Sequence, residues 1–470
     1  MPADLILGEL RGLRSADLPT HGGRTLAYVY DSGLSEVDKL GAAAHALFSP
    51  ANALDPTAFP SLGKMENELV HYTADLLGGD EDTVGTVTSG GTESCLLAVL
   101  AARDAHPEIT APSIVLPSTA HAAFHKAAHY FGLRKVSVPV DPGTFRADPA
   151  AIAAVIDDTT VLVVASAPSY AHGVLDPITE IAAAAAARGV RMHVDACIGG
   201  WVLPFFVLNG VELPPFGLDV PGVTSISVDL HKYAYCPKGV SVLLHANAAL
   251  RRPQYFASAD WPGYTMLNTT MQSTRSGGPI AAAWATILHL GEKGYVQLAG
   301  DADIATTEIR HGIELLDGLR ILGDPVSTLL SFTTDSTAYD LFTVADKMRA
   351  RGWYVQPQFA HESSPMNLHL TITAANRRHE REFIDALAES VVAARRDGPV
   401  VIDPRTVAYV AALDPAELTG EQFQGVLKAA GMGAPHGVPS NMAHINALIA
   451  CAPPPLRERL LLEFLGALYS

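Results

Sequence analysis

The chain has 470 residues, which is long enough for a large buried core and more than one domain. Hydrophobic residues make up 48% of it and charged residues only 17%, which excludes a disordered chain. The formal net charge is −17, from 49 acidic and 32 basic residues. This charge disfavours nucleic acid and anionic membrane surfaces as partners, because both attract basic patches.

The N-terminal sequence, the length of the apolar runs and the cysteine pattern argue against a secreted, membrane-spanning, disulfide-rich or zinc-binding protein. The sequence contains no run of 18 apolar residues, and residues 1–19 lack the basic start and apolar stretch of a signal peptide. The four cysteines are scattered and form no CxxC pair, so we expect neither a disulfide framework nor a zinc site. We therefore expect a cytoplasmic protein without a membrane span.

After an N-terminal segment, residues 1–60, short apolar stretches alternate with alanine-rich helical stretches up to about residue 300. This alternation predicts a large α/β domain over residues 61–300, with a mainly parallel sheet covered on both faces. The predicted strands and helices alternate in chain order at 83–89, 92–105, 113–118, 120–132, 160–167, 178–189, 190–196 and 223–228.

The pattern changes after residue 300 and predicts a smaller α+β C-terminal domain over residues 301–470. A long helix at 276–316 is expected to bridge the two domains. Two proline-containing stretches near the C-terminus, 433–441 and 451–458, are interpreted as irregular connections.

The stretch "TSGGTES" follows a predicted strand and opens a predicted helix. Gly90 and Gly91 allow a close approach of the backbone, and the start of a helix offers unpaired N–H groups, with the Thr92 hydroxyl beside them. This combination favours a phosphate cradle, and the absence of GxxxxGK[ST] argues against a nucleotide P-loop. The alternative is an ordinary glycine turn with Thr92 as the helix cap.

An aspartate ends the apolar stretch "RMHVDA". A buried charge needs a partner, and the carboxyl end of a parallel strand points into the ligand crevice. Asp195 is therefore predicted to contact a ligand, with a structural or helix-capping aspartate as the alternative.

A lysine and a histidine stand at two further strand ends. Lys232, in "SVDLHKYAYCPKG", follows the apolar stretch 223–228, and a lysine desolvated there is expected to have a lowered pKa and to form a Schiff base. His121 follows the predicted strand 113–118 and opens a helix. A surface lysine and a capping histidine are the alternatives.

Together these features have one economical explanation. A phosphate cradle, a histidine that can stack on a flat ring, an aspartate and a Schiff-base lysine, in this order on an α/β sheet, describe a site for pyridoxal 5′-phosphate (PLP). The aspartate would keep the pyridine nitrogen protonated, so that the ring acts as an electron sink.

The sequence resembles the fold-type I PLP enzymes of the group II decarboxylase superfamily, and within it the sphingosine-1-phosphate lyase branch. The similarity is carried by seven motifs: "FPSLGKMENELV", "VTSGGTES", "HAAFHKAAHYFG", "APSYAHGVLDPI", "HVDACIGGWVLPF", "SVDLHKYAYCPKG" and "STRSGGPIAAAWA". The resemblance implies the fold-type I PLP-dependent transferase fold.

The resemblance also implies roles at the cofactor. Lys232 would carry it covalently, Asp195 would bind the pyridine nitrogen, and His121 would stack on the ring and belong to the catalytic set. Gly91 and Thr92, beside Gly90, would hold the phosphate.

Other implied roles concern the partner subunit and the substrate. Such enzymes place the active site at a homodimer interface, where the segment 273–278, with Thr274, would reach the partner's phosphate. His231 would contact the cofactor phosphate. Tyr170 and Lys238 match groups of the lyase branch that act as acid or base on a substrate hydroxyl.

Two departures from the branch concern the substrate. The motif "NPLHP" reads "NALDP" here, so Asp55 replaces a histidine, and a tyrosine-bearing "SGAVY"-like segment reads "SGLSEV". An aspartate would repel a phosphate and favour a cationic or hydroxylated group. Alternatively, the alignment shifts locally, and His45 or Tyr30 supplies the missing contact.

The expected activity is cleavage of a carbon–carbon bond in a small β-hydroxy amine, releasing an aldehyde, with a long-chain sphingoid phosphate excluded by Asp55. The alternative is an α-amino acid decarboxylase, because the same cofactor cleaves whichever bond stands perpendicular to its ring. That reading needs a cation to hold the carboxylate, and the sequence does not reveal one. A third hypothesis, a non-catalytic scaffold, conflicts with the intact set of Lys232, Asp195 and His121.

Overall fold

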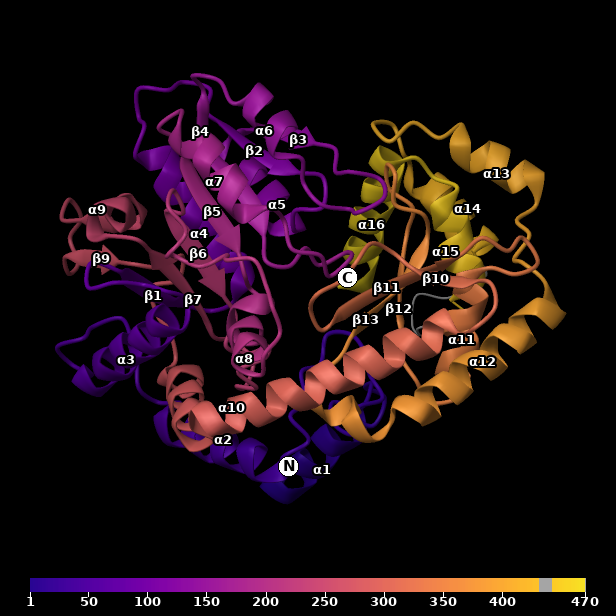
Figure 1. Cartoon of the computed structure of the whole chain (residues 1–470), viewed down its shortest axis with the longest axis horizontal. Helices are drawn as coiled ribbons and strands as arrows, with labels where there is room; N and C mark the ends of the chain where they lie inside the picture. The colour runs from indigo at the N-terminus through magenta and orange to yellow at the C-terminus, as the bar shows by residue number, and fades with distance from the viewer. Residues whose placement is uncertain (431–441, 470) are drawn as a thin grey trace.

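The structure is a computed structural model of the chain, and it describes residues 1–430 and 442–469. Two lobes stand side by side in Figure 1, with the large sheet and its helices in one and the smaller sheet in the other. The helix α10 runs beneath both of them. This arrangement confirms the predicted fold class.

A seven-stranded sheet forms the centre of the large lobe, in the order β1-β7-β6-β5-β4-β2-β3. Strands β2 to β6 pair in parallel, whereas β7 is antiparallel to both β1 and β6. The strands are β1 Val84–Thr88, β2 Ser113–Pro117, β3 Arg134–Val138, β4 Thr160–Ser166, β5 Arg191–Asp195, β6 Ser225–Val228 and β7 Ser241–His245.

Burial along the strands follows their place in the sheet. Every residue of the central strand β4 is buried, whereas the edge strand β3 is mostly exposed. A strand covered on both faces needs a continuous apolar run, which explains why the sequence "TVLVVAS" was recognisable and "RKVSV" was not. The helices around this sheet are α3 Pro60–Leu76, α4 Gly91–Asp104, α5 Ala122–Phe131, α6 Pro149–Val155, α7 Ile178–Ala186 and α8 Leu203–Leu208.

The long helix α10 spans Gly277–Glu314 and joins the two lobes, as predicted. Its first half packs into the core of the large lobe, and residues near its end pack into the core of the small one. Gly291, with φ of 55°, interrupts the helical geometry, which glycine allows because it lacks a Cβ. The division into residues 1–60, 61–300 and 301–470 stays a prediction, and residue 300 lies inside this helix.

The small lobe contains a four-stranded antiparallel sheet in the order β10-β11-β13-β12, with two helices packed against it. Its β10 and the two-stranded β8–β9 ribbon, Phe256–Ser258 and Met266–Asn268, were not predicted. The elements of the lobe are β10 Leu319–Ile321, β11 Leu329–Thr334, α11 Leu341–Ala350, β12 Gln356–Gln358, β13 Asn367–Thr371 and α12 Glu380–Asp397.

In the described residues after α12 lie the helices α13 Pro404–Ala411, α14 Gly420–Ala429, α15 Ala443–Ala450 and α16 Pro454–Leu468. They share an apolar cluster of their own. The interpretation of 451–458 as irregular is wrong, because α16 begins at Pro454, and proline is well tolerated in a first helical turn. The stretch 433–441 lies outside the described residues.

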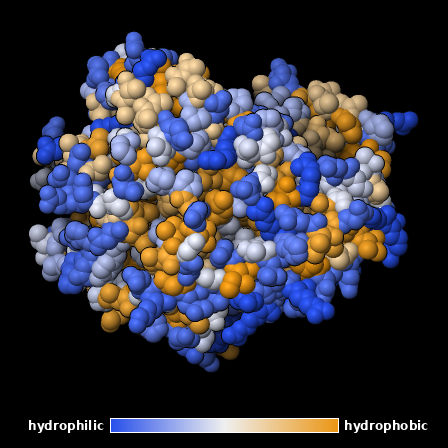
Figure 2. All heavy atoms as spheres, in the orientation of Figure 1, coloured by the Kyte–Doolittle hydropathy of each residue, from blue (hydrophilic) through white to orange (hydrophobic). Residues whose placement is uncertain are grey.

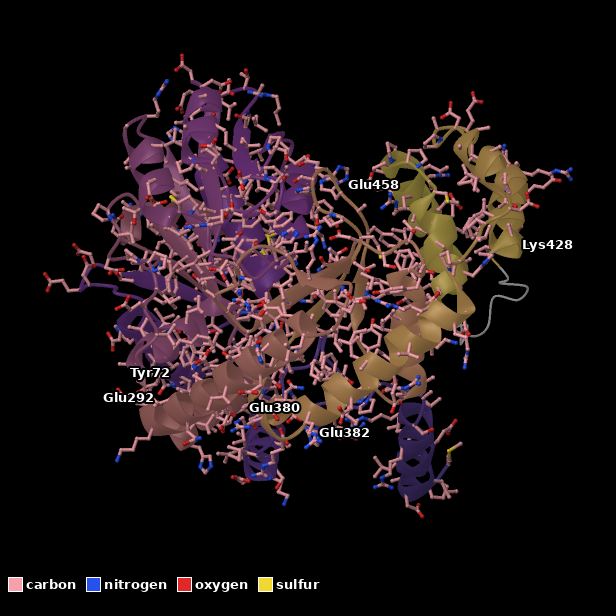
Figure 3. The ribbon with its side chains drawn as sticks, turned by 45° about the vertical axis from the view of Figure 1, so that its right-hand side comes forward. Tyr72, Glu292, Glu380, Glu382, Lys428 and Glu458 are labelled. Atoms are coloured by element: carbon pink, nitrogen blue, oxygen red, sulfur yellow. The ribbon has the colours of Figure 1, made fainter. Side chains whose placement is uncertain are left out.

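At the N-terminus, α1 Ala3–Arg14 contains no buried residue and stands apart from the body of the chain in Figure 3. The next helix, α2 Ser35–Phe48, packs against α10. Figure 2 shows a notch between the two lobes at the upper edge of the molecule and apolar residues exposed in the middle of the same face. Among the described residues, no helix is both long enough and apolar enough to span a bilayer.

Candidate active site

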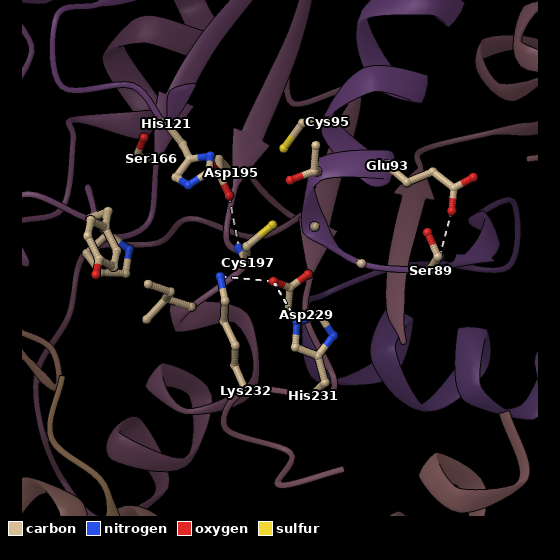
Figure 4. Close-up of a pocket in the computed structure, with 16 residues that line it drawn as sticks. Ser89, Glu93, Cys95, His121, Ser166, Asp195, Cys197, Asp229, His231 and Lys232 are labelled. Carbon is tan, nitrogen blue, oxygen red and sulfur yellow. Dashed lines mark hydrogen bonds and ion pairs between the residues drawn. The ribbon is translucent and has the colours of Figure 1, made fainter. Parts of the chain in front are cut away.

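A cavity of about 370 Å³ opens at the carboxyl ends of the central strands. β1, β4, β5 and β6 each lead into its wall, which is where parallel α/β sheets place ligands. Figure 4 shows the side chains converging on it. The lining residues are Ser89, Gly90, Gly91, Thr92, Glu93, Cys95, His121, Ser166, Pro168, Tyr170, Asp195, Cys197, Ile198, Asp229, His231 and Lys232.

The predicted phosphate cradle forms the start of α4, directly after β1. A Cβ added to Gly91 would lie 2.7 Å from both carboxylate oxygens of Asp229 and 2.8 Å from Cys197 Sγ. Only glycine therefore fits at this position, and the free N–H groups of the helix start remain accessible to an anion.

The buried Glu93 side chain fixes the cradle from behind. One of its carboxylate oxygens accepts the backbone N–H of Ser89 at 2.6 Å, and the other accepts that of Met271 at 2.8 Å. Glu93 thus joins the cradle to the segment that precedes α10. The sequence interpretation did not select this residue, although an acidic residue in the first turn of a helix is a common signal.

Asp195 ends β5 with its side chain 8% exposed, and its Oδ1 accepts the N–H of Cys197 at 3.1 Å. His121 faces the same cavity from the start of α5. Its Nδ1 also accepts the N–H of Ala123 at 3.2 Å, so the capping role held open as an alternative is present together with the position in the cavity. Figure 4 shows His121 beside Asp195.

Lys232 projects into the cavity, where its Nζ lies 2.9 Å from Asp229 Oδ2. The expectation of a lowered pKa is wrong in this state. Burial by itself would lower the pKa of Lys232, but the nearby Asp229 carboxylate outweighs it and holds the pKa well above its ordinary value. Burial would raise the pKa of Asp229, and here Lys232 and His231 reverse that effect and lower it.

Asp229 is the main residue that the sequence interpretation missed. It is 2% exposed, and its Oδ1 has no hydrogen-bond partner among the described residues. Asp229 could have been predicted from the sequence, because it is a charged residue directly after a buried strand. The same reasoning selected Asp195.

His231 lies beside both Asp229 and the cradle. Its Nδ1 donates to the carbonyl of Val240 at 2.7 Å, and its Nε2 is 3.7 Å from Asp229 Oδ2. A Cβ on Gly90 would lie 3.4 Å from the His231 ring. The ring therefore stands beside the place predicted for a phosphate.

Tyr170 enters the same cavity after β4 and donates to Gln356 Oε1 at 2.7 Å. Its ring stacks on that of His369, with 4.3 Å between centroids, and meets His121 edge-on at 6.4 Å. Burial raises the pKa of Tyr170, so its hydroxyl keeps its proton at neutral pH. His369 is fully buried behind Tyr170.

Lys238 stands close by, with its Nζ 4.7 Å from the centre of the Tyr30 ring and 3.2 Å from the carbonyl of Tyr28. Desolvation, and then the positive charge of Lys232, lower the pKa of Lys238 to about 8. The fold thus brings Tyr30 close to Lys232 and Lys238. This position supports the alternative in which the alignment shifts locally and Tyr30 supplies the substrate contact of the tyrosine that the segment 32–37 lacks. His45 packs instead against Gly278, at the start of α10.

Three predicted site residues are not among those that line this cavity: Lys238, which stands near Tyr30, and Asp55 and Thr274. Asp55 is exposed, and its carboxylate accepts hydrogen bonds from the backbone and hydroxyl of Thr57, at 2.8 and 2.6 Å. Thr274 is exposed in the segment before α10. A single chain does not bring either residue to Lys232, so their predicted roles stay predictions.

Cys95, Asp195 and Cys197 form a further group that the sequence interpretation did not connect. Their ligand atoms lie within 4.8 Å of one another, and all three residues are buried. Nothing in the spacing of these cysteines along the chain announced this proximity.

The residues of the cavity fit PLP. A Cβ at Gly91 would fill the cradle, and one carboxylate oxygen of Asp229 has no hydrogen-bond partner among the described residues. Asp195 also lines the cavity, and Lys232 is the amine within reach. An acidic partner for a pyridine nitrogen and a lysine for the aldehyde are the groups that this cofactor requires.

Comparisons with known proteins agree with this fit. Residues 38–332 match the model of the pyridoxal-dependent decarboxylase conserved domain, and residues 404–467 match that of a pyridoxal-dependent enzyme C-terminal putative HTH domain. The chain is 40% identical over 360 residues to a sphingosine-1-phosphate lyase of Dictyostelium discoideum, covering 76% of this chain and 67% of that protein. It is 38% identical over 391 residues to sphingosine-1-phosphate lyase 1 of Rattus norvegicus, covering 82% and 67%.

Solved structures give the same assignment. The sphingosine-1-phosphate lyase of Burkholderia pseudomallei superposes with a TM-score of 0.79 at 37% identity, covering 84% of this chain and 92% of that one. A glutamate decarboxylase of Lactobacillus brevis, at 19% identity and a TM-score of 0.74, shares the fold. The chain therefore belongs to the pyridoxal-dependent decarboxylase family, in its sphingosine-1-phosphate lyase branch, and is a PLP-dependent lyase.

Proposed function

We propose that the enzyme cleaves the Cα–Cβ bond of a β-hydroxy amine and releases an aldehyde. The observation that carries this proposal is the pair of groups beside Lys232. Lys238 has a pKa near 8 and can take a proton, whereas Tyr170 keeps its proton and can donate a hydrogen bond. Cleavage of this kind needs both functions at a substrate hydroxyl.

Each cofactor-binding residue has a proposed role. Asp195 holds the pyridine nitrogen, and His121 covers the ring face. Gly90, Gly91 and Thr92 hold the phosphate at the positive end of α4, with His231 beside them and Thr274 reaching the partner's site.

The cleavage step moves one proton and two electron pairs, and a second proton follows at Cα. Lys238 accepts the proton of the β-hydroxyl, and Tyr170 donates a hydrogen bond to the same oxygen. The O–H electron pair becomes the second bond of the aldehyde, while the pair of the Cα–Cβ bond stays on Cα. PLP, which Lys232 would hold until the substrate amine displaces it, would supply the electron sink for that pair. The freed Lys232 then returns a proton to Cα.

The decarboxylase alternative receives less support from the cavity. An α-carboxylate needs a cation to hold it, and arginine is the residue best shaped for that task. Among the described residues that line the cavity, Lys232 is the only lysine or arginine, and its amine is required for the cofactor. Lys238, near Tyr30 outside this lining, is the one further cation in the proposal, and its role as a base requires its neutral form, which does not hold a carboxylate.

The substrate is proposed as a small amine without a long sphingoid chain. The relatives are named for sphingosine 1-phosphate. In this chain the negative charge of Asp55 stands at the motif position where the branch has a histidine, and a negative charge at that position disfavours a substrate phosphate.

We further propose a homodimer in the cytoplasm. Four apolar residues of α1, Ile6, Leu7, Leu10 and Leu13, are 44–68% exposed and lie on one side of the helix. Because the chain itself buries none of these four residues, their exposure is best explained by a partner subunit that covers them.

The test is a panel of β-hydroxy amines, β-hydroxy amino acids and plain amino acids, including sphingosine 1-phosphate, with detection of aldehyde and of carbon dioxide. Aldehyde from a small β-hydroxy amine is the expected result. Carbon dioxide from an amino acid would establish the decarboxylase, and rapid turnover of sphingosine 1-phosphate would overturn the proposed substrate class. If the purified protein bound no PLP, that result would support the hypothesis of a non-catalytic scaffold.

A further inference from the structure

Residues 269–276 join β9 to α10, and we call them the connecting segment. Its Thr274 is exposed in the single chain, and the role proposed for this residue is at the cofactor phosphate of the partner subunit. The way in which the connecting segment is held in its own chain therefore sets where Thr274 stands in the other subunit's site.

One side of the connecting segment is held by Glu93, in the first turn of α4. Its Oε1 accepts the backbone N–H of Met271 at 2.8 Å, and its Oε2 accepts that of Ser89 at 2.6 Å. Glu93 is 7% exposed, and in Figure 4 its side chain points toward Ser89 and away from Lys232. A single carboxylate thus connects the phosphate cradle to a segment 178 positions further along the chain.

The other side of the connecting segment is held by Arg275, whose side chain is 11% exposed. Its guanidinium donates to the carbonyl of Val87 at 3.0 Å and lies 2.7 Å from the Glu66 carboxylate. Val87 belongs to β1, two residues before Ser89. Thr274 therefore stands between two anchors, and both of them end at β1 or at the cradle that follows it.

The connecting segment also fixes the motif that contains Asp55. The carbonyl of Arg275 accepts the N–H of Ala53 at 2.9 Å, and the N–H of Arg275 donates to Oδ1 of Asn52 at 3.3 Å. Asp55 and Thr274, which a single chain leaves away from the cavity, thus belong to one hydrogen-bonded unit. A displacement of the connecting segment would move both of them.

The contacts of Glu93 differ from those of an ordinary helix cap. A glutamate at the third position of a helix commonly accepts the N–H of the cap residue. In α4 the cap residue is Gly90, whereas Glu93 accepts the N–H of Ser89 and uses its second oxygen for Met271. Among the described residues no lysine or arginine forms an ion pair with this carboxylate, so the two N–H groups and the positive end of α4 compensate its charge. Loss of either N–H is therefore costly.

We propose that Glu93 is a positioning residue that couples the cofactor cradle of one subunit to the active site of the other. Glu93 holds the connecting segment against the cradle of its own chain, and the segment presents Thr274 to the cofactor phosphate in the partner subunit. The inference rests on the proposed function, because it needs the homodimer in which Thr274 has that role. Its consequence is that a change at Glu93 weakens PLP binding in the other subunit.

The experiment uses full-length mixed dimers whose subunits carry different affinity tags. One subunit is Lys232→Ala, so the visible absorbance of lysine-bound PLP reports only the wild-type subunit beside it. This dimer is compared with one in which the Lys232→Ala subunit also carries Glu93→Gln. The glutamine amide has one acceptor oxygen, so either Ser89 or Met271 loses its acceptor. The wild-type subunit should then bind PLP about tenfold more weakly, as expected for one lost hydrogen bond to a charged group.

Glu68→Gln in the Lys232→Ala subunit is the matched control, because Glu68, on α3, accepts the indole N–H of Trp284 at 2.6 Å and forms no hydrogen bond with the connecting segment. It should leave the PLP affinity of the wild-type subunit unchanged. Met271→Pro removes the N–H that Glu93 accepts and leaves Glu93 in place, so it should reproduce the tenfold loss even if the Glu93→Gln subunit does not fold. Met271→Ala keeps that N–H and should have no effect.

Equal PLP affinities of the wild-type subunit beside the Lys232→Ala, Lys232→Ala/Glu93→Gln and Lys232→Ala/Met271→Pro partners would overturn the coupling. A Glu93→Gln subunit measured beside a Lys232→Ala partner gives the effect within one chain. A loss seen only there would also overturn the coupling, because Glu93 would then serve its own cradle alone. A protein that is monomeric by mass would refute the proposed homodimer together with the coupling. If no substrate yields aldehyde, the proposed reaction fails, whereas the PLP affinities still decide the role of Glu93.

Discussion

Lys232 and Asp229 illustrate how two neighbours control the chemistry of the site. The lysine must be neutral to attack the aldehyde of PLP, yet the aspartate 2.9 Å away favours its charged form. In Asp229→Asn the burial of Lys232 is no longer opposed, so the pKa of the lysine should fall. The rate at which PLP binds covalently to the apoenzyme should then reach its maximum at a lower pH than in wild type. Stopped-flow absorbance after addition of PLP measures this rate, and an unshifted pH profile would contradict the pairing.

Lys238 provides a second prediction for single residues. Its pKa, lowered to about 8, means that the neutral amine that can accept a proton becomes the major form above pH 8. If Lys238 is the base, kcat/KM should rise with pH through about 8 and then level off. Lys238→Arg keeps the positive charge but cannot act as a base, so the rise should disappear and activity should fall by about a hundredfold. Tyr170→Phe is the comparison, since it should lower kcat and leave this pH dependence in place.

Helix α4 sets the cofactor site at the scale of the element. Gly91→Ala would place a Cβ 2.7 Å from the Asp229 carboxylate and 2.8 Å from Cys197 Sγ. We expect a loss of about 1–3 kcal/mol in the free energy of unfolding of the holoenzyme and at least a tenfold weaker affinity for PLP. Gly63→Ala in α3 is the control, because no atom lies within 4 Å of its Cβ, and it should stabilise the helix by about 0.5–1 kcal/mol. Thermal unfolding with and without PLP separates the two effects, and equal behaviour of both variants would be evidence against the cradle.

The elements also show what could be predicted from the sequence. β4 was predicted because a strand buried on both faces has an almost continuous run of apolar residues, and β5 because it follows an alanine-rich helix in the alternation of strands and helices. β3 escaped notice because an edge strand keeps polar residues on its exposed side, and β7 because nothing local states that it runs antiparallel to both of its neighbours. The prolines at 453–455 suggested an irregular connection, whereas they lead into α16.

At the scale of the whole molecule, α1 is the feature that a single chain leaves unexplained. In the proposed homodimer, its exposed residues Ile6 and Leu10 pack on the partner. The double variant Ile6→Ser/Leu10→Ser should shift the protein toward monomer and lower its activity in proportion, as measured by light scattering coupled to size exclusion. Arg11→Ala on the same helix should leave the mass unchanged. A wild-type protein that is monomeric at micromolar concentration would refute the homodimer.

The sequence by itself determined the cofactor and the family. Motif chemistry is local, since a glycine pair before a helix, an aspartate at a strand end and a lysine after the next strand are each readable within a few residues. Tertiary structure decided which neighbours change that chemistry. Asp229 reverses the pKa shift expected for Lys232, Tyr30 approaches Lys238 across 208 positions of the chain, and Tyr170 donates a hydrogen bond to Gln356 of the small lobe. These pairings depend on how separate elements pack, because electrostatic and packing energies act through space and leave no pattern along the chain.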